Sequence, residues 1–399
     1  RNVDHLFDPE RKTAIHQWHA DNGAEFEDVG QWKRPHYFPQ KNENINDAVN
    51  RECKAVRNSL GILDASTLGK IDLQGPDVAK FLNLIYTNAW SKLEVGSCRY
   101  GLMCNEHGMV FDDGVTTRIS ENRYHMTTTT GGAARVMSWL EEFLQTEWLD
   151  MEVFCTSVTE QWTVLSISGP NSREFLSSLT DIDISKEAFP FMKMKEGTVC
   201  GIDARIFRIS FTGELSFEIN VPSRYGLFVW NEFMKLGKKY DITPYGTESM
   251  HVLRAEKGFI IVGQDTDGSV TPKDINMDWI VSKKKEDFLG KRSFSRSDTR
   301  RTDRKQLVGL LVNDKKTVLP EGSYVVDEAK PRPPMDMIGH VSSSYYSPTC
   351  DHPIALALIK NGLNRMGDVV KIPLMSGKVI DATITDSIFY DKEGARNNE

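Results

Sequence analysis

The chain has 399 residues, of which 39% are hydrophobic and 26% are charged, and its formal net charge is −7. This length predicts two or three globular domains rather than a single core. The longest apolar runs, at 258–263 and 354–359, are far shorter than the ~20 residues that cross a bilayer, and the negative charge offers no basic stripe for nucleic acid. We therefore expect no membrane span and no nucleic-acid partner.

The six cysteines lie far apart and form no C-x-x-C pair. Their spacing argues against a structural zinc site and against a disulfide scaffold, and it favours a reducing, cytoplasmic setting. His16 and His19 could offer two metal ligands, but no third ligand stands near them, so we predict no metal site. The first residue is not Met and no secretory signal follows, which suggests a piece of a longer protein.

The first half of the chain predicts alternating helices and strands. Residues 1–46 mix Trp, Pro and charges without periodicity, so we expect an N-terminal arm with little regular structure. A helix is predicted from an N-cap at Asp47 to Gly61, because apolar residues recur at spacings of three and four. Residues 69–75 alternate like a strand, and a second helix follows with Pro76 in its first turn.

A hairpin is predicted over 97–119, with its turn at 105–108. It places Asp112 and Asp113 side by side at the end of a short apolar run. Acids in such a position are often only a solvated strand end. Strands and helices then alternate as far as an amphipathic helix over 225–240, so the predicted class is α+β.

The last third of the chain has a different pattern. Residues 282–305 are locally basic, and we interpret them as an exposed linker. Short strand-like runs separated by turns follow, with almost no helical periodicity, and they predict a small β-barrel or sandwich. The expected domains are the arm at 1–46, a region of two intertwined α+β subdomains at 47–298, and a C-terminal β-barrel at 306–392.

Common cofactor motifs are missing from the sequence. It contains no G-x-G-x-x-G, no phosphate-binding P-loop, no H-E-x-x-H and no G-x-S-x-G, which disfavours a dinucleotide or zinc enzyme. Glu218 lies in the strand-like run "LSFEINV", on the face opposite Phe217 and Ile219. It could face solvent or a cleft. The polar residues that could carry chemistry are Tyr100, Asp112, Asp113, Glu214, Glu218, Glu248, His251, Arg254 and Glu256.

Seven segments, in this order, resemble the folate-binding aminomethyltransferases. They are "GILDASTLGKIDLQGPDVAKFLN", "RYGLMCNEHGMVFDDGVTTRI", "ISGPNSREFL", "ISFTGELSFEI", "YGTESMHVLRAEKG", "DFLGKR" and "SSSYYSPTCDHPIALALI". That family includes the T-protein of the glycine cleavage system and the folate domains of dimethylglycine and sarcosine oxidases. The resemblance implies a multidomain aminomethyltransferase-like α+β fold with a small C-terminal β-barrel.

Within the family, segments such as "TTTTGGAARV" and "GQDTDGSVTPKDINMDWIV" are most similar to the C-terminal half of sarcosine oxidase alpha subunits. This implies a tetrahydrofolate-dependent module that converts the iminium or formaldehyde equivalent from sarcosine oxidation to 5,10-methylenetetrahydrofolate. It also implies beta, gamma and delta partner subunits, with flavin and NAD held by them or by a missing N-terminal half. The alternatives are a stand-alone glycine cleavage T-protein or demethylase, and a scaffold without folate chemistry.

The resemblance also implies roles for particular residues. Asp113 matches the essential aspartate of the family, Tyr100 its pterin-side tyrosine, and Glu218 the pterin-binding glutamate of "TGExxxE". A carboxylate suits the last role because it can accept hydrogen bonds from a ring N–H and an adjacent amine together. Asp112 is then a neighbouring hydrogen-bonding residue of the folate site.

One departure from the family pattern concerns the folate tail. Where T-proteins have an arginine in a "GARD"-like segment, this chain has Met250 in "GTESM". Arg254 is a possible substitute, although an arginine beside Glu256 and Lys257 on a helix is more often a structural ion-pair residue.

Overall fold

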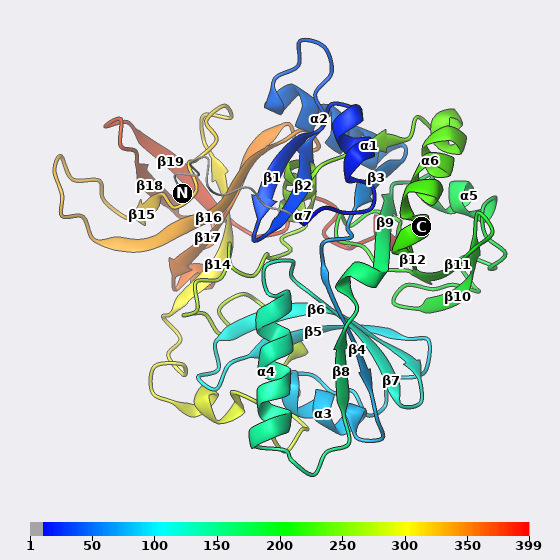
Figure 1. The fold of residues 1–399 in the computed structure, drawn as a ribbon. Helices are drawn as coiled ribbons and strands as arrows, with labels where there is room; N and C mark the ends of the chain where they lie inside the picture. The colour runs from blue at the N-terminus through cyan, green and yellow to red at the C-terminus, as the bar shows by residue number, and fades with distance from the viewer. Residues whose placement is uncertain (1–10, 399) are drawn as a thin grey trace.

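The computed structural model describes residues 11–398, which form two layered α/β units and a barrel (Figure 1). The first unit is a five-stranded antiparallel sheet with strand order β5-β6-β7-β4-β8. Helices α3 and α4 cover one of its faces, where Phe81 and Trp139 pack on Leu73 and Met126. The elements are β4 (Gly69–Gln74), α3 (Val78–Ile85), β5 (Cys98–Cys104), β6 (Val110–Ser120), β7 (Arg123–Thr128), α4 (Ala133–Thr146) and β8 (Phe154–Ser157).

The second unit is a six-stranded sheet with strand order β10-β11-β12-β9-β3-β13. Phe217 and Ile219 point from this sheet into a core shared with α5 and α6, which supply Phe175 and Trp230. The elements are β3 (Gly61–Asp64), β9 (Trp162–Ser168), α5 (Ser172–Ser177), β10 (Met194–Val199), β11 (Ile202–Phe207), β12 (Ser216–Pro222), α6 (Gly226–Leu236) and β13 (Thr243–Pro244).

The C-terminal strands close into a six-stranded barrel with order β14-β17-β16-β15-β18-β19, seen at the left of Figure 1. Apolar side chains from every strand fill it, which makes it a packed core and not a channel. The strands are β14 (Lys305–Val312), β15 (Tyr324–Val326), β16 (Met337–Ser347), β17 (His352–Lys360), β18 (Val369–Pro373) and β19 (Val379–Thr385). The predicted α+β class with a small C-terminal barrel is confirmed.

The expectation of little regular structure before residue 47 is wrong for its described part. It forms α1 (His16–Asp21) and a hairpin of β1 (Glu25–Val29) and β2 (Trp32–Tyr37). These elements pack on α6 and on α7 (Thr247–Glu256) through contacts far away in sequence, which periodicity cannot reveal. Residues 1–10 of the predicted arm lie outside the described residues.

Two local predictions also need correction. Helix α2 spans Ile45–Asn58, and its N-cap is Asn44, because Asn44 and Asp47 form a reciprocal capping box that makes Asp47 the third helical residue. The basic segment 282–305 is not simply exposed, since Phe288 and Thr299 are buried within it. Among residues 11–398, no helix has the length and apolar character needed to cross a membrane.

A buried ion-pair cluster around Arg57 joins the parts of the chain. Its guanidinium, on α2, donates to Glu214 Oε1 at 3.0 Å and to Glu256 Oε2 at 2.5 Å, and all three side chains are almost completely buried. Ser347 of the barrel donates to the other Glu256 oxygen at 2.6 Å. The cluster therefore connects α2, the loop before β12, α7 and the barrel.

Replacing Arg57 with leucine should destabilise the chain by about 3–5 kcal/mol, because it leaves the buried Glu256 carboxylate without its cation, while Glu214 keeps Arg396. Urea unfolding measures the change. Lys371→Gln, which breaks the exposed pair with Asp381, is the control and should cost less than about 1 kcal/mol. Equal effects from the two variants would show that the Arg57 cluster does not hold the chain together.

Candidate functional site

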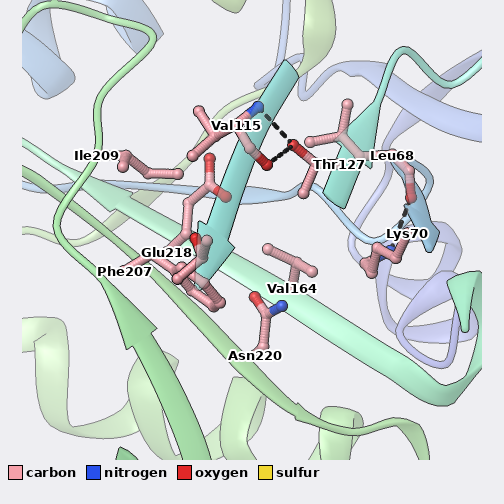
Figure 2. Close-up of a pocket in the computed structure, with 10 residues that line it drawn as sticks. Leu68, Lys70, Val115, Thr127, Val164, Phe207, Ile209, Glu218 and Asn220 are labelled. Carbon is pink, nitrogen blue, oxygen red and sulfur yellow. Dashed lines mark hydrogen bonds between the residues drawn. The ribbon is translucent and has the colours of Figure 1, made fainter. Parts of the chain in front are cut away.

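The two sheets meet across the faces opposite those that pack on α3 and α4 and on α5 and α6, and a pocket lies between them (Figure 2). The enclosed cavity is narrow, about 10 Å³, close to the space that one water molecule needs. Half of the residues that line it are apolar and half are polar. The lining residues are Leu68, Lys70, Val115, Thr117, Thr127, Val164, Phe207, Ile209, Glu218 and Asn220.

Glu218 reaches this pocket because of strand alternation on β12. Its neighbours Phe217 and Ile219 are fully buried against α5 and α6, so Glu218 must point to the opposite face, toward the other sheet. None of the described residues donates a hydrogen bond or forms an ion pair to its carboxylate. Burial raises the pKa of Glu218 to about 7, and the nearby charge of Lys70 acts in the opposite direction. The prediction of a cleft-facing carboxylate agrees with this position, and the solvent-facing alternative does not.

Asp113 lies on β6 in the opposing sheet, two residues before Val115 and on the same strand face. Tyr100 on β5 donates its hydroxyl hydrogen to Asp113 Oδ2 at 2.6 Å. Burial raises the pKa of Asp113 to about 7, the Tyr100 hydrogen bond lowers it, and the charge of Asp112 raises it. Asp113 can therefore exchange a proton near neutral pH, as a general base requires.

Asp112 points to the other face of β6 and is fully buried. Its carboxylate accepts hydrogen bonds from the backbone and hydroxyl of Thr129, at 3.1 and 2.9 Å, and from the backbone of Asp113 at 2.8 Å. A Cβ at Gly132 would lie 1.8 Å from Asp112 Oδ2, so only glycine fits where β7 passes into α4. The hydrogen-bonding character predicted for Asp112 agrees with this position, but its partners are protein groups and it has no open side toward a ligand.

Arg254 is also removed from the pocket. It is fully buried on α7, where it pairs with Asp265 at 2.6 Å and donates to Ser343 Oγ at 2.7 Å. Its position corresponds to the structural ion-pair alternative, although the partner is Asp265 and not the neighbouring Glu256. The prediction that Arg254 contacts the folate tail needs correction, because no part of the side chain is accessible.

The remaining residues of the sequence-derived set do not join the pocket. Glu214 and Glu256 hold Arg57, and Glu248 pairs with His36 and His251. No group of three or more His, Cys, Asp or Glu side chains within residues 11–398 is arranged to hold a metal ion. Of the predicted residues, Glu218 lines the pocket, while Asp113 and its partner Tyr100 lie on the sheet face that carries the lining residue Val115.

Two lining residues, Lys70 and Asn220, were missed by sequence reasoning. Lys70 on β4 is fully buried and donates to the carbonyl oxygens of Ser66 and Leu68, both at 2.8 Å. Burial lowers its pKa to about 7, while the charges of Asp64 and Glu218 raise it. A lysine in a strand normally suggests a solvated face. Asn220 could have been found, because it shares a strand face with Glu218.

Family comparisons agree with this geometry. Residues 15–285 match the model described as GCVT N-terminal domain, and residues 305–391 match the glycine cleavage T-protein C-terminal barrel domain. The chain therefore belongs to the glycine cleavage T-protein family, and the predicted family membership is confirmed. A solved aminomethyltransferase T from Bartonella henselae shares the fold, with a TM-score of 0.82 at 24% identity, over 96% of this chain and 98% of that chain.

Particular relatives are similar over nearly the whole chain. Sarcosine oxidase subunit alpha from Corynebacterium sp. (strain U-96) is 55% identical over 98% of this chain, and the one from Rhizobium meliloti (strain 1021) is 40% identical over 98%. This chain spans only 41% and 40% of the length of those two relatives. An aminomethyltransferase from Thermotoga petrophila is 27% identical over 95% of this chain and 98% of its own length.

Glu218→Gln should stabilise the chain at pH 8 by about 1–3 kcal/mol, since each unit of pKa corresponds to about 1.4 kcal/mol. The folded state holds a proton on Glu218 up to a pKa near 7, so its carboxylate costs stability as the pH rises from about 4.5 to 7. The amide does not ionise and avoids this cost. Thermal unfolding should show a small difference at pH 5 that grows toward pH 8.

The control for this prediction is Glu142→Gln on the exposed face of α4, which should leave the unfolding temperature unchanged at both pH values. A Glu218→Gln variant that is less stable than the parent at pH 8 would mean that the carboxylate has a partner in the folded chain.

Proposed function

We propose that this chain is the tetrahydrofolate-dependent C1-transfer part of a sarcosine oxidase alpha subunit. Its substrate would be the iminium or formaldehyde equivalent formed when sarcosine is oxidised, and its product 5,10-methylenetetrahydrofolate. The observation that carries the proposal is the unpaired carboxylate of Glu218 in the pocket between the sheets. The similarity to sarcosine oxidase alpha subunits over 98% of the chain supports it.

The pocket suits a reduced pterin. Val115 lies on the β6 side and Val164 and Phe207 on the β9–β11 side, so both sheets supply apolar side chains that could pack on the two faces of a flat ring (Figure 2). Glu218 can accept hydrogen bonds from a ring N–H and the adjacent exocyclic amine with its two oxygens. When bound, tetrahydrofolate supplies the nucleophilic nitrogens that accept the C1 unit.

Asp113 has the chemistry needed at the reacting end. In its ionised form it can stabilise a cationic iminium carbon and accept the proton that an attacking amine must lose. Tyr100 fixes the orientation of that carboxyl group through the 2.6 Å hydrogen bond. Asp112 would contribute indirectly, because it holds the β6 backbone through Thr129.

Oxidation of sarcosine itself is assigned to other parts of the enzyme. The sequence has no glycine fingerprint for a dinucleotide, so flavin and NAD would reside in beta, gamma and delta subunits or in an N-terminal half of the same subunit. Six free cysteines support a cytoplasmic location. The division into an arm at 1–46, a folate region at 47–298 and a barrel at 306–392 forms part of this proposal.

Titration of the purified chain with tetrahydrofolate, followed by the fluorescence of its eight tryptophans, tests the proposal. The chain should bind tetrahydrofolate and should form no peroxide from sarcosine. Glu218→Gln should weaken binding by about 1.5–3 kcal/mol, because a charge-assisted acceptor is lost and an amide N–H faces a ring donor. Absence of binding, or peroxide from the chain alone, would overturn the assignment. Binding with full transfer in the absence of any oxidase subunit would favour the stand-alone aminomethyltransferase.

Asp113→Asn should keep the fold and most of the folate affinity but remove most C1 transfer in the assembled oxidase. The amide has the shape of the carboxyl group but can neither balance a cation nor accept a proton. During sarcosine turnover, free formaldehyde should replace methylenetetrahydrofolate as the product, and both can be quantified in one reaction.

Asp150→Asn, at an exposed position after α4, is the matched control and should leave the product ratio unchanged. If Asp113→Asn forms methylenetetrahydrofolate at the parental rate while Asp112→Asn does not, the catalytic carboxylate has been assigned to the wrong residue. Parental rates in both variants would favour the scaffold alternative.

A further inference from the structure

Asn220 carries a buried acceptor with no partner. It lies on β12 two residues beyond Glu218, is 3% exposed, and lines the same pocket. Its Oδ1 has no hydrogen-bond partner among residues 11–398. Buried side-chain oxygens are nearly always hydrogen-bonded, so an unpaired one in a residue that lines a pocket points to a donor supplied by a ligand.

The neighbouring donors do not satisfy this oxygen. Across the strand from Asn220 lies Arg205, whose Nε donates to Glu196 Oε1 at 2.9 Å and whose guanidinium stacks over Trp162. The Arg205 Nη1 is itself without a partner, and it forms no hydrogen bond to Asn220. On the facing sheet, the Lys70 amine is committed to backbone carbonyl oxygens. Because both atoms are unpaired, a hydrogen bond from Arg205 Nη1 to Asn220 Oδ1 in solution is the alternative to a ligand donor, and the experiment below tests it.

The spacing along β12 matches one amine group. Side chains at positions i and i+2 of a strand lie on one face, about 6.6 Å apart along the strand. A nitrogen that donates to two acceptors at about 2.9 Å each spans about 5–6 Å between them. Glu218 and Asn220 can thus both accept from a single amine placed between them.

We propose that Asn220 is a specificity-determining residue whose Oδ1 accepts the second hydrogen of the exocyclic amine of a reduced pterin. This inference rests on the proposed function. Glu218 accepts from the ring N–H and from one amine hydrogen, which leaves the other amine hydrogen buried and unpaired unless Asn220 accepts it. Two side chains of one strand face would then recognise the 2-amino group together.

The test compares two ligands and two proteins. Asn220→Leu removes the acceptor while keeping a similar volume, and it should raise the Kd of tetrahydrofolate about three- to tenfold, the effect of losing one neutral hydrogen bond. The 2-desamino-2-methyl analogue of tetrahydrofolate lacks the amine. It should bind the parent chain more weakly than tetrahydrofolate does, and Asn220→Leu should not weaken it further.

Each alternative gives a different pattern. If Asn220→Leu leaves the Kd of tetrahydrofolate unchanged, or weakens the binding of both ligands equally, the proposed role of Asn220 is wrong. If equal weakening comes with a lower unfolding temperature of the free chain, Asn220 instead bonds to Arg205. A parent chain that binds neither ligand would instead contradict the proposed function itself. Asn220→Ala provides the same comparison if the leucine variant does not fold. Asn58→Leu, at an exposed position on α2, is the control and should change neither Kd.

Discussion

The candidate site depends on one constraint, which is that the two sheets meet through the faces opposite those that pack on α3 and α4 and on α5 and α6. Each sheet packs one apolar face against helices, so the alternate residues of its strands, apolar Val115 and Phe207 as well as Glu218, point to the opposite face. Glu218 from β12 thus lines the pocket between the sheets, and Asp113 lies on the same face of β6 as the lining residue Val115. Both side chains are half-buried, and burial raises both pKa values to about 7.

The carboxylates of the chain interior differ in whether a cation pairs with them. Glu214 and Glu256 are fully paired with Arg57 at a junction of four structural parts, where they serve stability. Glu218 has no partner among the described residues, and its ionised form therefore destabilises the folded chain. Sites that hold unpaired groups for a ligand commonly lose stability in this way. The presence or absence of a partner thus distinguishes Glu214 and Glu256 from Glu218.

Strand alternation and family motifs predicted the elements that carry the site. The run "LSFEINV" indicated correctly that Glu218 opposes Phe217 and Ile219, and the motif likeness selected Asp113 over Asp112. The wrong predictions concern residues whose structure depends on contacts with distant parts of the chain. Arg254 forms an ion pair with Asp265, eleven residues away. Helix α1 and the β1–β2 hairpin pack on α6 and α7. Local sequence does not specify such contacts, and it could not show that a strand lysine such as Lys70 would be buried.

The central claim is that the space between β6 and β12 binds a reduced pterin through Glu218, and a diffraction structure of the chain with 5-formyltetrahydrofolate tests it most directly. We expect the ring between the two sheets, with its N–H and amine edge within about 3 Å of the Glu218 carboxylate and its other end toward Asp113. A ring bound outside this space, or a Glu218 carboxylate turned away from it, would contradict the account.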